Sequence, residues 1–265
     1  MKKCFSALSA ALVILCLTST GKGADITTNA AAAEPFDYAQ PALLTGIVYE
    51  AGSGHKKVLF KFQRVATRSG STVHVERKFL LPDGAAAATE NIVYESGQMV
   101  SCEMKELQAD LWGSILIKGD SHKPARQKII ISHGRGGDTK KPGTSDDLSR
   151  DTLIDDTIYP FIVAHWDDLM RDGSVKFRFV SLEWEKTFGF KLSKSDESFR
   201  DRTQVVTIKM ESTNLLVARF MNPVYFTLEK NDPHRIVEYL GRTTPRVKNG
   251  KSWKYLDADT VFDWK

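Results

Sequence analysis

Residues 129–138, IIISHGRGGD, are the best candidate in this chain for acyl-transfer chemistry. A β-branched run is followed by His133 and then by glycines at positions 134, 136 and 137. Backbone N–H groups of such a glycine loop can stabilise the negative oxygen that forms when a nucleophile attacks an acyl group. The segment suggests one alternative function, a secreted serine hydrolase or esterase that uses the glycine loop His133–Asp138.

A hydrolase of the α/β class also needs a serine on a sharp G-x-S-x-G turn, within a parallel sheet of alternating strands and helices. No serine in this sequence has glycine both two positions before it and two positions after it. Ser145 comes closest, with Gly143 before it and Asp147 after it. We therefore expect a strand over 126–132 followed by a hairpin or a disordered loop, and the hydrolase stays the alternative.

The segment AHWDD places His165 and Asp168 three residues apart, on one face of an expected helix. Such a pair could orient an imidazole for base catalysis or supply two ligands to a metal. No spacing rule links a third ligand to the pair. We instead expect aromatic side chains of this helix to cover the sheet, and the candidate ligand-binding residues are Phe161, His165 and Trp166.

Cys102 is the only cysteine beyond the first 24 residues. In VSCEM it alternates with Val100 and Met104 on an apolar strand face, which predicts a buried structural thiol and not a nucleophile.

Three other histidines lie in expected strands or turns without partners, and we expect them at the surface: His55, His74 and His122. The terminal KYLDADTVFDWK has aspartates but lacks the glycine and glutamate of a calcium loop. The sequence predicts no catalytic residue, no metal site and no cofactor.

The first 24 residues have the pattern of an export signal. Two lysines precede an apolar run, Phe5–Leu17, and small residues follow, so we expect cleavage near Gly23 or Ala24. Cys16 leaves lipid anchoring as an alternative, although a bulky leucine precedes it. We predict a periplasmic or secreted protein.

The charge of the chain is small once the expected signal is removed. The whole chain carries a net charge of +4, and residues 1–24 hold three lysines and no acid, which leaves +1. A nearly neutral protein has no global electrostatic reason to bind nucleic acid. No other stretch is long and apolar enough to predict a transmembrane span in the mature chain.

Short alternating runs separated by turn residues dominate residues 41–265 and predict antiparallel strands. Val175, Phe177 and Phe179, for example, fall on one face of a strand, which gives that strand one buried side. The segment 91–107 predicts a hairpin that turns at Ser96-Gly97, and the segment NLLVARFMNP (214–223) predicts another strand.

One amphipathic helix is expected in DDTIYPFIVAHWDDLMRDG, which covers 155–173. Asp156 or Thr157 can cap its start, and Pro160 suits its first turn. The fold class is therefore mainly β, a curved antiparallel sheet or partly open barrel packed on one amphipathic helix. We expect a flexible leader over 25–40 and a single β-rich domain over 41–265.

The region 155–241 resembles a group of uncharacterised exported bacterial proteins, with an A-H-W-D-x-L helix, a V-x-F-x-F strand and a closing arginine-to-tyrosine-glycine strand. The matching residues are Ala164, His165, Trp166, Asp167, Leu169, Val175, Phe177, Phe179, Met210, Asn214, Leu216, Pro223, Arg235, Tyr239 and Gly241. The resemblance implies export but no activity, because none is established for the group. A weaker, fold-level analogy is with periplasmic lipoprotein carriers, whose curved sheets shelter acyl chains.

Export, half-apolar strands and an aromatic helix together favour a non-enzymatic binding or envelope-associated protein. Its ligand would be an apolar or lipid-like molecule, or an envelope protein, held between sheet and helix. The alternatives are a filled core without a cavity, a structural or adaptor protein, and the secreted serine hydrolase. The oligomeric state is left open.

Overall fold

A computed structural model of the 265-residue chain describes residues 37–119, 127–136, 138, 143–149, 151–171, 173–197, 203–219 and 221–264. The expected export signal, most of the expected leader and Gly137 of the glycine loop lie outside these residues. Within the described part, no helix has the length and apolar character needed to cross a membrane.

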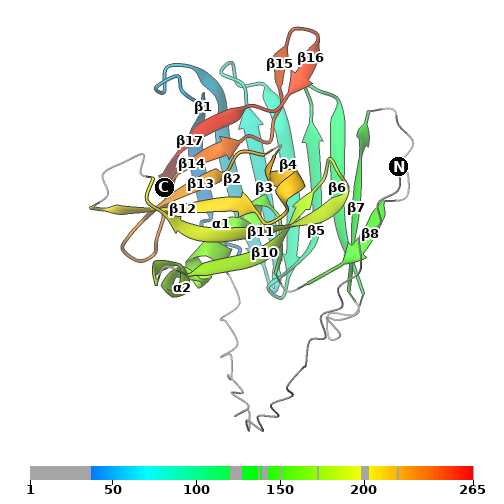
Figure 1. Ribbon diagram of the computed structural model, residues 1–265. Helices are drawn as coiled ribbons and strands as arrows, with labels where there is room; N and C mark the ends of the chain where they lie inside the picture. The colour runs from blue at the N-terminus through cyan, green and yellow to red at the C-terminus, as the bar shows by residue number, and fades with distance from the viewer. Residues whose placement is uncertain are drawn as a thin grey trace, which may run out of the picture. The chain divides into compact units, whose positions relative to one another are not determined.

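Strands make up most of the described chain (Figure 1). They are β1 (Leu43–Glu50), β2 (Val58–Ser69), β3 (Thr72–Leu80), β4 (Ala86–Glu95), β5 (Gln98–Glu106), β6 (Leu111–Lys118), β7 (Lys128–Arg135), β8 (Thr144–Asp147), β9 (Thr152–Leu153), β10 (Ser174–Ser181), β11 (Lys186–Ser195), β12 (Val205–Ser212), β13 (Val224–Glu229), β14 (Ile236–Arg242), β15 (Val247–Asn249), β16 (Ser252–Lys254) and β17 (Asp257–Trp264). The helices are α1 (Asp155–Ala164), α2 (Trp166–Met170) and α3 (Leu215–Ala218).

Fifteen of these strands form one curved sheet, in the order β8-β7-β6-β5-β4-β3-β2-β1-β17-β14-β13-β12-β11-β10-β9. Strands β1 to β8 form one meander and β9 to β14 a second, and all pairs are antiparallel except β9 with β10. The two meanders are joined by β17, which pairs with β1 on one side and with β14 on the other. The predicted fold class is confirmed, with a sheet that strand pairing does not close.

Side chains bridge the two ends of this sheet. Asp146 of β8 accepts a hydrogen bond from the Thr187 hydroxyl of β11 at 2.5 Å and from Arg178 of β10 at 3.1 Å. The carboxylate of Glu185, in the turn between β10 and β11, accepts the backbone N–H of His133 at 2.9 Å. Polar side chains thus hold β7 and β8 against the β10–β11 hairpin.

The main hydrophobic core lies between α1 and the sheet. Ile158, Phe161 and Ile162 of α1 are buried in a cluster that contains apolar residues of both meanders. Phe161 packs on Phe177 of β10, with ring centroids 5.7 Å apart. Each such buried side chain stabilises the fold by roughly 1.5–3 kcal/mol, so α1 is held by packing on the strands.

Several local expectations need correction. The helix begins at Asp155 and its N-cap is Ile154, so neither Asp156 nor Thr157 is the cap; the Thr157 hydroxyl accepts the backbone N–H of Ile154 at 2.9 Å. The helical segment divides at His165 into α1 and α2. The expected strand over 214–223 is wrong, because the Asn214 side chain accepts the Val217 N–H at 3.3 Å and starts the short α3.

The expected hairpin turn is confirmed, whereas the expectations for β7 and β17 need correction. The turn at Ser96-Gly97 joins β4 to β5, and both residues have positive φ, as a type I′ hairpin turn requires. The strand in IIISHGRGGD runs through residue 135, three residues further than expected, because His133 and Gly134 continue the pairing with β6. The sequence pattern of residues 257–264 did not predict strand β17.

Candidate functional site

Two adjoining cavities lie inside the curved sheet, one of about 180 Å³ and one of about 130 Å³. We call them the larger and the smaller chamber. Seven residues line both, so the chambers are two parts of one interior space that these side chains divide: Arg77, Asp155, Met210, Tyr239, Arg242, Thr243 and Thr244. The interior is therefore incompletely filled.

The larger chamber has an apolar wall built from both meanders and α3. Its apolar lining includes Met104, Ile115, Phe179, Trp184, Phe188, Phe190, Met210, Val217, Met221 and Val224. Trp184, in the β10–β11 turn, is 45% exposed, and Leu215 at the start of α3 is 89% exposed. Flexible methionine side chains and large aromatic rings can pack against apolar ligands of different shapes. The β10–β11 turn and α3, which contribute to this wall, therefore also carry exposed apolar side chains.

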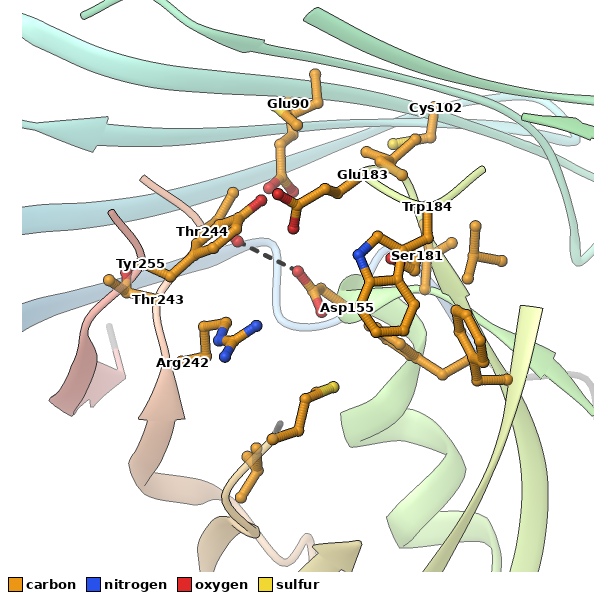
Figure 2. A pocket seen from close by; sticks show the side chains of 18 of the residues that line it. Glu90, Cys102, Asp155, Ser181, Glu183, Trp184, Arg242, Thr243, Thr244 and Tyr255 are labelled. Atoms are coloured by element: carbon orange, nitrogen blue, oxygen red, sulfur yellow. Dashed lines mark hydrogen bonds between the residues drawn. The ribbon is translucent and has the colours of Figure 1, made fainter. Parts of the chain in front are cut away.

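Two charged side chains of opposite sign are accessible within this space (Figure 2). Asp155 and Arg242 are both exposed although they line both chambers. The Asp155 carboxylate accepts the Thr244 hydroxyl at 3.2 Å, and the Arg242 guanidinium lies over the Tyr255 ring, 5.2 Å from its centroid. A carboxylate and a guanidinium therefore share one solvent-reached region beside an apolar wall.

A buried ion pair closes another side of the larger chamber. Arg77 donates to the Glu90 carboxylate at 2.6 Å, and its guanidinium lies 5.5 Å from the centroid of the Phe62 ring. Burial, together with the negative charges of Asp155 and Asp156, raises the pKa of Glu90 to about 7, although Arg77 opposes the rise.

Cys102 lies in the same wall, and the prediction that it is buried is confirmed. Burial, aided by the nearby charge of Glu90, raises the pKa of its thiol well above the usual range. The thiol therefore stays protonated and is a poor nucleophile.

Glu106 is also paired, through Arg246. Arg246 donates from its backbone N–H at 3.0 Å and from its side chain at 2.9 Å to Glu106, and it reaches Glu183 at 3.2 Å and the Tyr255 hydroxyl at 2.7 Å. Glu106 is buried, whereas Asp155 and Arg242 are exposed, so the latter two are the more accessible charges in the cavity.

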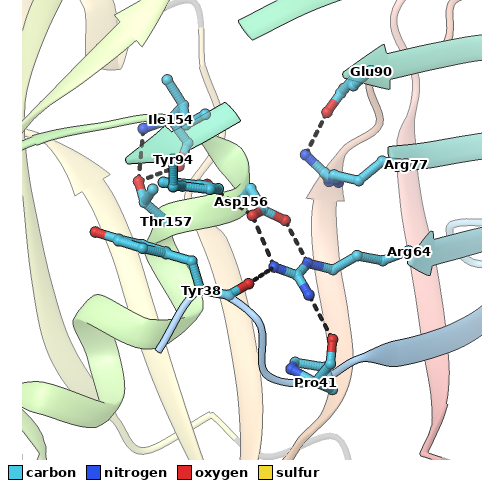
Figure 3. A network of polar contacts seen from close by, with 9 residues as sticks. All are labelled: Tyr38, Pro41, Arg64, Arg77, Glu90, Tyr94, Ile154, Asp156 and Thr157. Carbon is cyan, nitrogen blue, oxygen red and sulfur yellow. Dashed lines mark hydrogen bonds and ion pairs between the residues drawn. The ribbon is translucent and has the colours of Figure 1, made fainter. Parts of the chain in front are cut away.

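A third buried ion pair, Arg64–Asp156, lines the smaller chamber (Figure 3). Arg64 of β2 donates to Asp156 of α1 at 2.7 and 3.1 Å, and also to the carbonyl oxygens of Pro41 at 2.6 Å and Tyr38 at 2.9 Å. The Tyr94 hydroxyl donates to Asp156 at 2.8 Å. Burial alone would raise the pKa of Asp156, but Arg64 and these hydrogen bonds hold that pKa below its ordinary value.

Of the three residues predicted to bind a ligand, Phe161 belongs to the main core and Trp166 packs against it. Phe161 is buried, and its backbone oxygen lies 2.9 Å from Nδ1 of His165. Trp166 stacks on His234 with centroids 3.8 Å apart. Among the described residues, the chambers are lined by other side chains, whereas Trp166 borders a separate hollow of about 460 Å³. Ligand binding by the three residues stays a prediction.

The His165–Asp168 pair is not assembled, because Asp168 forms an ion pair with Arg171.

The cavity residues were not predicted from the sequence, although charged residues on apolar strand faces could have indicated two of them. Arg77 and Glu90 occupy positions of the inward, apolar strand faces, as the burial patterns of β3 and β4 show. A charged residue at such a position marks a buried polar contact or a polar cavity wall.

The backbone of the expected glycine loop is already hydrogen bonded where the structure describes it. The N–H of His133 donates to Glu185 at 2.9 Å, and the N–H of Gly136 donates to the carbonyl oxygen of Asp110 at 2.7 Å. Ser145 is exposed on β8. These donors are occupied, so the geometry gives the hydrolase alternative no support.

Fold and site together define a class of protein: a curved, unclosed antiparallel β-sheet with an apolar interior cavity that carries accessible charges. No family model, no curated protein and no solved structure matches this chain. The resemblance to exported bacterial proteins therefore stays a prediction.

The Arg64–Asp156 pair leads to the first prediction. Replacing Arg64 by Met leaves Asp156 buried without its counter-charge and should lower the free energy of unfolding by about 3–5 kcal/mol. The double variant Arg64→Met with Asp156→Leu removes both charges and should recover a large part of that loss. Urea unfolding at pH 7 measures the unfolding free energy of both variants. A double variant as unstable as Arg64→Met would contradict the prediction that the two charges stabilise each other.

The raised pKa of Glu90 leads to the second prediction. Between pH 4.5, the ordinary pKa of a glutamate, and about pH 7, the folded protein holds a proton on Glu90 that the unfolded chain has released. The contribution of Glu90 to stability therefore falls as pH rises through this window. Glu90→Gln should make the unfolding free energy less dependent on pH between 5 and 8.

Urea unfolding at four pH values tests this. Glu76→Gln, a half-exposed position on β3, is the matched control for loss of one carboxylate. If the unfolding free energy depends on pH in the same way in wild type and Glu90→Gln, then Glu90 is ionised over the whole pH range and the prediction is contradicted.

Proposed function

We propose that this protein binds an amphiphilic small molecule in its interior cavity, outside the cytoplasm. The apolar part of the ligand lies against the phenylalanine and methionine side chains of the larger chamber. The polar head lies near Asp155 and Arg242. The observation that carries the proposal is the unfilled interior, in which an apolar wall adjoins two accessible charges of opposite sign.

The dimensions of the cavity support a small ligand. Small-molecule sites typically measure roughly 300–1,000 Å³, and the two chambers together reach the lower end of this range. Transfer of an alkyl chain from water to the apolar wall is favourable by about 0.8 kcal/mol for each buried CH₂ group. A chain of eight to twelve carbons would supply most of the affinity.

The charges of the cavity favour a zwitterionic head. Asp155 can accept from a cationic group and Arg242 can donate to an anionic one, and both are exposed to the same space. A head with a single charge would place that charge beside a residue of like sign. The paired state of Glu106 and the protonated thiol of Cys102 favour binding over catalysis.

Native mass spectrometry tests this function directly. The protein is purified, extracted with organic solvent, and titrated below the critical micelle concentration with dodecylphosphocholine, laurate or dodecyltrimethylammonium. We expect one bound dodecylphosphocholine per chain, with weaker binding of the two singly charged amphiphiles. Absence of stoichiometric binding by all three would overturn the proposal, and a preference for either charged probe would overturn the zwitterionic head.

The cavity walls lead to the third prediction. Trp184→Ala removes an exposed part of the apolar wall, and Arg242→Gln removes the accessible cation. Each change should weaken binding of dodecylphosphocholine about tenfold, which corresponds to about 1.4 kcal/mol. Lys176→Gln, at an exposed position on β10, is the control and should bind as the wild type does. Unchanged affinity in both cavity variants would place the ligand elsewhere.

A further inference from the structure

Three metal-ligating side chains meet outside the cavity, at the junction of the two meanders. Asp259 lies on β17, Glu238 on β14, and His55 in the turn that follows β1. Successive strand residues point to opposite faces, so Asp259 faces away from Thr260 and Phe262, which line the smaller chamber. The cluster is therefore separate from the cavity.

The strand register explains how the three side chains come together. Asp259 lies opposite Leu240 of β14 and opposite Tyr49 of β1, and Glu238 occupies the diagonal position. The His55 ring stacks on Tyr49 with centroids 4.7 Å apart, and this contact holds the imidazole over β17. One donor atom from each residue lies within 4.8 Å of the other two.

The charges of the cluster favour a cation. Glu238 is 5% exposed, so one carboxylate is buried beside a second one. Asp259 contacts His55 through Oδ2, whereas its Oδ1 is buried and has no hydrogen-bond partner among the described residues. Burying carboxylates costs free energy unless a cation or hydrogen bonds compensate. The unpaired Asp259 carboxylate oxygen thus lies on a residue whose neighbours supply two further metal-ligating atoms.

We propose that His55, Glu238 and Asp259 bind a divalent transition-metal ion, with Zn²⁺ as the probe. Imidazole and carboxylate are ligands of Zn²⁺ at about 2.0–2.2 Å, whereas Mg²⁺ and Ca²⁺ take oxygen ligands. Bonds of that length place ligand atoms about 3.0–3.5 Å apart in ordinary coordination geometries. The His55 side chain is 44% exposed in a turn, so its ring is free to adjust its position when an ion binds.

A bound ion would tie the β1–β2 turn to β17 and β14. Three protein ligands leave at least one coordination position for water or another ligand. The ion would thereby stabilise the part of the sheet where the first meander, the last strand and the second meander meet.

Zinc titration of the untagged protein tests this site. The protein is stripped with a chelator and then titrated with ZnCl₂ in competition with a chromophoric chelator, and bound metal is counted by elemental analysis. We expect one Zn²⁺ per chain. Zn²⁺ at about 100 times its Kd should raise Tm by roughly 5–10 °C, whereas Mg²⁺ should not.

Two variants locate the ion, and a third is the control. His55→Ala and Asp259→Asn should each weaken Zn²⁺ binding about 100-fold and abolish the rise in Tm. His74→Ala removes an exposed histidine of β3 and should leave both values unchanged. Binding of less than one ion per chain, or wild-type affinity in both His55→Ala and Asp259→Asn, would overturn the proposal.

Discussion

The ion pair between Arg64 and Asp156 is the contact on which the interior of this protein depends. It joins the inner face of β2 to the first turn of α1, and the same guanidinium holds the carbonyl oxygens of Tyr38 and Pro41. A buried arginine needs all of its donors satisfied, so the helix cannot shift along the sheet without breaking several hydrogen bonds. Asp155 precedes Asp156 in the same turn, and the pair therefore also positions the accessible carboxylate of the cavity.

Charges on the inward strand faces account for the unfilled interior. Arg64, Arg77 and Glu90 stand where neighbouring strand positions are apolar, and each pairs with a charge of opposite sign. Such pairs have fixed geometry and cannot collapse into a gap as aliphatic side chains do. Apolar clusters pack on both sides of them, one around α1 and one around Ile92, Ile129 and Ile131. Space remains where these clusters meet the charged residues.

Local sequence patterns predicted most of the architecture. Alternation identified the antiparallel strands, and apolar spacing identified α1, because both depend on residues close together in the chain. Strand β17 was not predicted because aspartates, which are uncommon in strands, occupy its outward face, while Ala258, Thr260 and Phe262 lie on the other face. The predictions of the α1 cap and of a strand over 214–223 were wrong, because a single polar contact decides the local structure at each place.

The candidate site could not be predicted from local patterns. Asp155 and Arg242 share a cavity only because α1 packs within a sheet whose order places β14 across from it. Similarly, the pairing of β17 with both β1 and β14 brings His55 and Glu238 to Asp259. Strand order is set by long-range contacts, and the spacing of residues in the chain carries little information about it.

The position of β17 also constrains how the chain can fold. Each meander can form as its own hairpins become available, but the strand that joins them follows both of them in the sequence. Until residues 257–264 are present, β1 and β14 are open sheet edges with unpaired backbone groups, which favour pairing with other chains. When the chain is synthesised from its N-terminus, both half-sheets therefore stay prone to aggregation until β17 is made. The cavity can be completed only after that step.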